Sequence, residues 1–103
     1  MDRKIEVIIK RADEPVGHKT AISNTLKNLQ THVGGYIEAV TLSPELVIIC
    51  NEEGRIRNLP YNCRIAGIDF YGDIILAGVD GEDFGDIPIS FGTYKKLLLG
   101  VAE

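Results

Sequence analysis

The apolar residues of this 103-residue chain fall into short runs separated by turn residues, and this spacing limits the folds that the chain can adopt. Parallel pairing of successive strands needs a crossover connection of about a dozen residues or more, usually a helix. Most connections between these runs consist of turn residues and lack such a helical crossover. We therefore expect an α+β fold, with a mainly antiparallel sheet and two packed helices, in a single domain over residues 1–103.

Four segments predict the strands of this sheet. Residues 3–11 alternate between apolar and polar side chains, and this period of two is typical of a strand with one face in the core. The other runs are apolar and rich in β-branched residues, and turn residues bound them. These runs predict strands over residues 36–42, 46–50 and 73–79.

The segment between the third and fourth strands is less regular. We expect a tight turn in which Gly54 takes a positive φ, followed by a short return strand over residues 55–59. Residues 61–67 are expected to form one helical turn, with Asn62 as its cap and Gly67 just past its end.

Two segments predict helices. Apolar residues at spacings of four, three and four indicate an amphipathic helix over residues 20–33, capped by Thr20 or Ser23 and ended at Gly34. Ser90 is the expected cap of a second helix over residues 90–100. The buried stripe of that second helix is expected to contain Tyr94, Leu97, Leu98 and Val101.

Charge and hydropathy exclude several classes of protein. The formal net charge is −4 and the pI is about 5.1, whereas a protein that binds duplex nucleic acid needs a basic face. No apolar run reaches the roughly 20 residues of a membrane span, and the first residues lack the apolar segment of a secretory signal. Cys50 and Cys63 have neither disulfide nor metal spacing, so we expect reduced core residues of a cytoplasmic protein.

Catalytic and metal-binding motifs are absent from the sequence. His18 and His32 lie 14 residues apart without further ligands at metal-site spacing, and we interpret both as surface residues. No phosphate-binding loop or nucleophile motif occurs. The adjacent carboxylates Glu52 and Glu53 are either an acid–base pair or, in the simpler interpretation, the solvated tip of a turn. We expect no metal, no cofactor and no catalytic residue.

The middle third of the chain contains the side-chain types that a nucleotide site requires. Aromatic rings stack on a base, forked Arg donors hold phosphate, and amide or carboxylate groups bond ribose or a base edge. In the alternative interpretation, Tyr36 and Tyr61 are core aromatics and Asn62 caps a short helix. The candidate ligand-binding residues are Tyr36 and Tyr61 for stacking, Arg55 and Arg64 for phosphate, and Glu38, Asn51 and Asn62 for ribose or base.

Four short motifs carry a family resemblance. They are Val33–Glu38, Asn51–Gly54, Leu59–Asn62 and Gly72–Gly78, which together span a little under half of the chain. In this combination and order they resemble the small family called domain of unknown function 3846. The resemblance implies a short protein of Gram-positive bacteria, their mobile elements or their phages, without a recognised catalytic motif.

Three functions follow from this setting. The first is an anti-defence protein that sequesters a host immune signalling nucleotide, of the cyclic or ADP-ribose type, in the cytoplasm of a bacterial host. The second is an inhibitor or adaptor that binds a host protein through an exposed strand edge or through the acidic C-terminal half. The third is a small hydrolase with carboxylates as acid and base. Because strand edges in a small domain need cover, we also expect a homo-oligomer.

Overall fold

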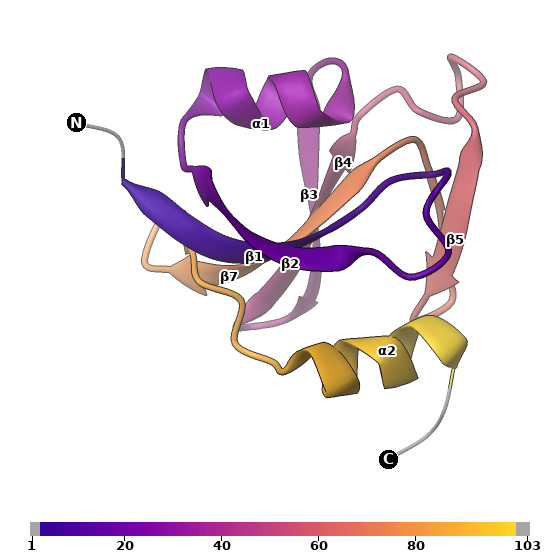
Figure 1. The fold of residues 1–103 in the computed structure, drawn as a ribbon. Helices are drawn as coiled ribbons and strands as arrows, with labels where there is room; N and C mark the ends of the chain where they lie inside the picture. Colours follow the sequence, from indigo (N-terminus) through magenta and orange to yellow (C-terminus); the bar gives the residue numbers. More distant parts are fainter. Residues whose placement is uncertain (1–2, 101–103) are drawn as a thin grey trace.

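Eight strands and two helices make up residues 3–100, which are the residues that the computed structural model describes (Figure 1). The single-domain prediction for residues 1–103 and the buried stripe through Val101 extend in part outside the described residues. The strands are β1 (Lys4–Lys10), β2 (His18–Ser23), β3 (Ile37–Ser43), β4 (Leu46–Asn51), β5 (Tyr61–Ile65), β6 (Ile68–Tyr71), β7 (Ile74–Asp80) and β8 (Asp83–Gly85), and the helices are α1 (Leu26–Val33) and α2 (Phe91–Leu99).

Six of the strands form one sheet. Its order is β2–β1–β7–β4–β3, and β8 pairs with the end of β7 on the same side as β1. The strands β5 and β6 form a separate hairpin. Every pairing within residues 3–100 is antiparallel, which confirms the predicted α+β fold with a mainly antiparallel sheet and two helices.

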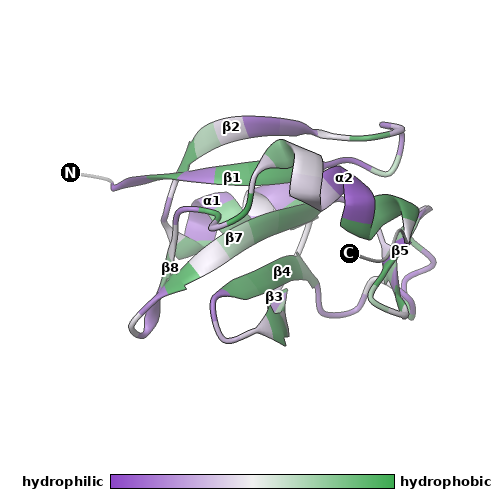
Figure 2. Ribbon diagram, turned by 90° about the horizontal axis from the view of Figure 1, so that it is seen from below, coloured by the Kyte–Doolittle hydropathy of each residue, from purple (hydrophilic) through white to green (hydrophobic). Residues whose placement is uncertain are grey.

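The two faces of the sheet are both covered. Because side chains alternate along a strand, Ile75 and Ala77 of β7 pack with Leu29 and Val33 of α1, whereas Leu76 packs on the opposite face. Figure 1 shows α1 on one side of the sheet and α2 on the other. In Figure 2 most of β4 has the hydrophobic colour, whereas part of the edge strand β2 is hydrophilic. The strand β4 is buried over its whole length.

The first predicted helix is shorter than expected. Residues 18–23 form β2, which pairs with β1 so that Ile22 lies opposite Ile5. The helical spacing that suggested residues 20–33 was misleading because Ile22 reaches the same core cluster as Leu29 from a strand. The cap is Thr25, whose Oγ1 accepts a hydrogen bond from the backbone N of Asn28.

The helix ends follow the local signals. Gly34 ends α1 in the left-handed conformation, with φ of 78°. Ser90 caps α2, as predicted, and its Oγ accepts a hydrogen bond from the backbone N of Thr93. No helix within residues 3–100 is long and apolar enough to cross a membrane.

Two predictions for residues 55–67 were wrong. The expected return strand at 55–59 belongs to a series of turns over residues 52–58, and the expected helical turn at 61–67 is β5 with the turn that follows it. Gly54 does not take a positive φ. Glycine is required at position 54 for a different reason, because a Cβ at this position would lie 2.8 Å from the carbonyl oxygen of Tyr71.

The turn between β5 and β6 strains one residue. Ala66 and Gly67 both have positive φ, 52° and 78°, as a two-residue hairpin turn of type I′ requires. A left-handed conformation is unfavourable for alanine because its Cβ approaches the following carbonyl oxygen. We expect Ala66→Gly to raise the free energy of unfolding by about 0.5–1 kcal/mol, measured by urea denaturation.

The matched control for this prediction is Gly67→Ala. No atom lies within 4 Å of a Cβ built at Gly67, so its cost is that of the backbone alone, about 1 kcal/mol. A lower stability of Ala66→Gly than of the wild type would contradict the interpretation of the turn.

Candidate functional site

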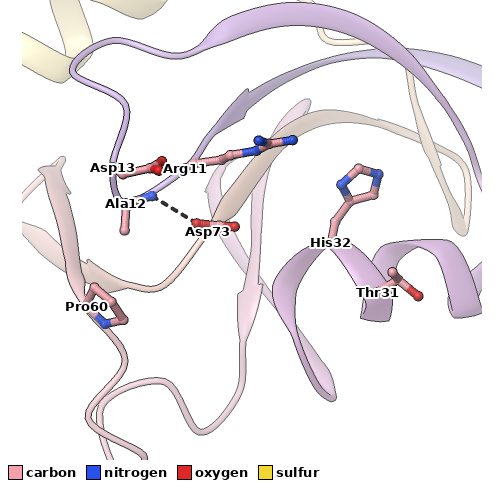
Figure 3. A pocket seen from close by; sticks show the side chains of 7 residues that line it. All are labelled: Arg11, Ala12, Asp13, Thr31, His32, Pro60 and Asp73. Atoms are coloured by element: carbon pink, nitrogen blue, oxygen red, sulfur yellow. Dashed lines mark hydrogen bonds between the residues drawn. The ribbon is translucent and has the colours of Figure 1, made fainter.

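A cavity lies where the β1–β2 connection, the end of α1 and the start of β7 meet. Its volume is about 610 Å³, which is within the usual range of roughly 300–1,000 Å³ for small-molecule sites. We call it the Arg11 cavity. Its lining residues are Arg11, Ala12, Asp13, Thr31, His32, Pro60 and Asp73 (Figure 3).

Charged and titratable groups dominate this cavity. Arg11 and Asp13 come from the β1–β2 connection, His32 comes from the last turn of α1, and Asp73 precedes β7. Figure 3 shows the Arg11 side chain extending toward His32. Within residues 3–100, no hydrogen bond or ion pair occupies the Arg11 guanidinium, the His32 ring or the Asp13 carboxylate, so all three are available to a ligand.

Asp73 holds the cavity wall in place. Its Oδ1 accepts a hydrogen bond of 2.9 Å from the backbone N of Ala12, which ties the β1–β2 connection to the start of β7 (Figure 3). Among the residues that the structure describes, no three His, Cys, Asp or Glu side chains are placed to hold a metal ion. The cavity therefore offers one guanidinium, one imidazole and two carboxylates for hydrogen bonding and proton transfer.

A second cavity lies on the other side of the β1–β2 connection. Its volume is about 340 Å³, and Ala12 lines both cavities. We call it the Lys10 cavity. It contains mostly apolar side chains from the connection, from β5 and from the C-terminal half of α2.

The residues predicted to bind a nucleotide do not share one cavity. Glu38, Asn51 and Arg55 line a cavity of about 160 Å³, and Tyr36 lines a different one of the same volume beside Arg57. Asn62 lies in the Lys10 cavity, and Arg64 lines a surface cavity beside the end of α2. The structure thus brings three of the seven candidates together and separates the others.

The two predicted asparagines are engaged by the fold itself. The Asn51 Nδ2 donates to the carbonyl of Val33, and its Oδ1 accepts from the backbone N of Glu53. The Asn62 Nδ2 donates to the carbonyls of Lys10 and Gly72, at 2.8 Å each. Asn62 caps no helix but joins the β5–β6 hairpin to the sheet. The amides that we assigned to ribose or base edges are therefore used within the protein.

The aromatic candidates are exposed and not part of the core. Tyr36 and Tyr61 are 69% and 51% exposed, which rules out the alternative interpretation of both as core residues. Tyr61 packs edge-on against Tyr71 at 5.4 Å between ring centroids, and the Arg55 guanidinium lies 5.2 Å from the Tyr71 ring centroid. Tyr71 thus links Arg55 and Tyr61 through its ring.

Asp69 joins two further candidates. Its Oδ1 accepts a hydrogen bond of 2.9 Å from the Tyr61 hydroxyl, and its Oδ2 lies 3.4 Å from Nη1 of Arg64. The hydrogen bond to Asp69 is the main cause that raises the pKa of Tyr61. The carboxylate of Asp69 therefore occupies the place beside Arg64 where we expected a phosphate.

A comparison with models of protein families shows which family this chain belongs to. The model of the family described as Domain of unknown function (DUF3846) matches residues 5–98. The chain belongs to this family. No curated protein and no solved structure matches it. The match covers the DUF3846 protein from β1 into α2, so it includes all the residues that line the Arg11 cavity. It also includes most of β1, which lies outside the four motifs.

Sequence reasoning did not predict Arg11, His32 and Asp73 as residues of one cavity in this DUF3846 protein. Arg11 directly follows an alternating strand and Asp73 directly precedes a buried one, so both mark strand ends. Their proximity depends on the pairing of β1 with β7, which are about sixty residues apart in the sequence. His32 was interpreted as a surface residue because the sequence has no further ligand at metal-site spacing from it.

The two thiols are poor candidates for a nucleophile. Cys50 and Cys63 are buried and free, as expected from the sequence. Burial raises the pKa of Cys50 from 9.0 to about 11, with a smaller contribution from the Glu38 carboxylate, and burial also raises the pKa of Cys63. Since the thiolate is the reactive form, both cysteines are expected to be inert in the folded protein.

The raised pKa of Cys50 predicts a loss of stability at alkaline pH. Below pH 9 the thiol is protonated in both states, and its burial has its full stabilising effect. Between pH 9 and about 11 the unfolded state loses the proton first, so the free energy of unfolding falls, by at most about 1.4 kcal/mol per pH unit for one thiol.

Denaturant unfolding from pH 7 to 10.5 measures this slope. We expect Cys50→Ala to be less stable than the wild type at pH 7 and to lose less stability as the pH rises. Equal slopes for the two proteins would contradict the assignment to Cys50.

Proposed function

We propose that this DUF3846 protein acts by binding a small phosphorylated ligand of the nucleotide class in the Arg11 cavity. The observation that carries the proposal is the presence of Arg11 and His32 in one cavity of about 610 Å³, where neither side chain makes a hydrogen bond or ion pair among residues 3–100. A guanidinium presents forked donors that match two oxygens of a phosphate, and an imidazole can supply another donor.

The carboxylates in the cavity narrow the ligand class. Asp13 and Asp73 can accept hydrogen bonds from ribose hydroxyls or from an amino group of a base, but they repel a highly charged polyphosphate. A phosphodiester carries one negative charge per phosphate. The combination therefore favours a cyclic or ADP-ribose-type nucleotide with few charges over a triphosphate.

The biological role of this binding is proposed from the family setting. The resemblance described above implies a short protein of Gram-positive bacteria, their mobile elements or their phages, and the proposed role rests on that implication. A small binding protein in that setting would sequester a host immune signalling nucleotide in the host cytoplasm, as an anti-defence protein. A homo-oligomer would carry several copies of the cavity.

Hydrolysis is a second candidate function for the same cavity. His32 and the carboxylates of Asp13 and Asp73 are the side-chain types that act as general acids and bases, and they line one cavity together with Arg11. This arrangement favours a phosphodiester as the substrate. Arg11 would hold the phosphate, His32 or a carboxylate would take a proton from the attacking water, and a second of these groups would protonate the leaving oxygen as its P–O bond breaks.

Calorimetry with cyclic dinucleotides and cyclic ADP-ribose tests the binding proposal. We expect saturable binding by the wild type and at least about tenfold weaker binding by Arg11→Ala, because a hydrogen bond to a charged group contributes about 1.5–3 kcal/mol. The Arg11 guanidinium makes no hydrogen bond or ion pair within residues 3–100, so this variant should keep most of the stability of the wild type.

Arg57→Ala is the matched control. Arg57 is an exposed arginine that pairs with Glu53 outside the Arg11 cavity, so its loss should leave the affinity unchanged. If Arg55→Ala weakens binding while Arg11→Ala does not, the ligand site is the cavity beside Tyr71 instead. If none of these nucleotides binds, the binding proposal is wrong for the classes tested.

Product analysis separates binding from hydrolysis. The binding proposal predicts that the nucleotide is recovered intact after incubation with the wild type. If products form, His32→Ala and Asp73→Asn should stop the reaction without abolishing binding. The amide oxygen of the Asp73→Asn variant can still accept from the backbone N of Ala12, so the cavity wall is kept. Product formation that survives both substitutions would contradict the hydrolase alternative.

A further inference from the structure

Lys10 is a buried lysine at the end of β1. It is only 3% exposed, although a lysine is almost never fully buried unless it is paired. A charged ammonium that leaves water needs strong compensation from hydrogen bonds or an opposite charge. The hydrogen-bond partners and charges around Lys10 therefore show whether the protein itself compensates this buried charge.

The partners of Lys10 within the described residues are neutral. Its Nζ donates to the Asn62 Oδ1 at 2.7 Å, and the carbonyl oxygen of Asn62 lies 3.5 Å away. No carboxylate of residues 3–100 lies within ion-pair distance of this ammonium. An ammonium has three donors, so these contacts leave at least one donor and the positive charge without a counterpart.

Asn62 fixes the ammonium in place. Its Nδ2 donates to the carbonyls of Lys10 and Gly72, which sets the amide with its Oδ1 facing Nζ. A buried lysine that is held in this way is preorganised, because no side-chain rearrangement is needed when an anion arrives.

The space beside Lys10 is mostly apolar. The Lys10 cavity has a volume of about 340 Å³, at the small end of the range for ligand sites. Its charged side chains are Lys10, Lys95 and Glu14. The apolar part of the lining consists of Ala12, Pro15, Val16, Cys63, Leu98 and Leu99.

Glu14 does not neutralise Lys10. Its Oε1 accepts a hydrogen bond from the backbone N of Arg11, and its Oε2 lies 3.0 Å from Nδ1 of His18. The backbone hydrogen bond from Arg11 is the main cause that lowers the pKa of Glu14. Both carboxylate oxygens of Glu14 thus interact with groups other than Lys10. Because Lys10 and Lys95 face only this one carboxylate in the lining, the cavity has an excess of positive charge.

We propose that the Lys10 cavity is a second ligand site, which binds a small carboxylate with an apolar chain. The carboxylate would take the remaining donor of Lys10, with Lys95 nearby at the exposed side, and the chain would lie against Val16 and Leu98. A nucleotide does not fit this chemistry, because the lining lacks a forked donor and an aromatic ring. The site is therefore separate from the Arg11 cavity.

Titration of the full-length protein with octanoate, octanol and octylammonium tests the proposal, with ¹H–¹⁵N spectra as the readout. We expect octanoate to shift the backbone signals of Val16, Cys63 and Leu98 in a saturable way. Octanol, which lacks the charge, should bind at least tenfold more weakly, and octylammonium should not bind. Equal affinities for octanoate and octanol would overturn the role of Lys10, and no saturable shift with octanoate would overturn the site.

Lys10→Met removes the charge and keeps most of the side-chain volume. This variant should bind octanoate at least tenfold more weakly than the wild type. Lys19→Met is the matched control, because Lys19 is an exposed lysine of β2 beside Glu6 and should leave octanoate affinity unchanged. If Lys10→Met does not fold, the comparison of octanoate with octanol on the wild type decides the proposal alone.

Arg11→Ala separates this proposal from the proposed nucleotide function. It should leave octanoate binding at the wild-type level, since Arg11 does not line the Lys10 cavity. Loss of octanoate binding in Arg11→Ala would mean that octanoate occupies the Arg11 cavity, and the second site would be wrong. A failure of nucleotide binding would leave the octanoate result unchanged.

Discussion

The burial of β7 on both faces is the constraint on which the rest of the structure depends. This strand lies between β4 on one side and β1 with β8 on the other, and residues 74–78 are buried. A strand that is apolar on both faces needs a covering layer on each side. The helix α1 provides one layer, and α2 with the β5–β6 hairpin provides the other.

The two cavities lie on opposite sides of the β1–β2 connection, one beside α1 and the other beside α2. Lys10 and Arg11 are consecutive residues at the end of β1, but Lys10 lines the cavity beside α2 and Arg11 lines the one beside α1. The alternation of side chains along a strand thus gives two cavities with linings of different chemistry. The Asn62 Nδ2 donates hydrogen bonds to the carbonyls of Lys10 and Gly72, which holds the β5–β6 hairpin against the sheet. The Asn62 Oδ1 accepts a hydrogen bond from Lys10 Nζ, so the same residue also orients the buried lysine.

The fold class could be predicted from the sequence, but the candidate site could be predicted only in part. Asn51 and Asn62 were predicted to bond ribose or a base edge, but the fold uses both amides for its own hydrogen bonds. A polar residue at a turn has the same sequence signature whether it binds the backbone or a ligand. Only the observed partners distinguish the two cases.

The sequence by itself determined the local features of this protein. Alternation in residues 3–11 sets β1, Ser90 caps α2, and Gly34 ends α1, because each depends on interactions within a few residues. The tertiary structure alone decided that Ile22 belongs to a strand and that Arg11 shares a cavity with Asp73 and His32. The physical reason is that the burial of whole sheet faces selects which strands pair. This pairing joins segments that are far apart in the sequence, so neither segment contains a local signal for its partner.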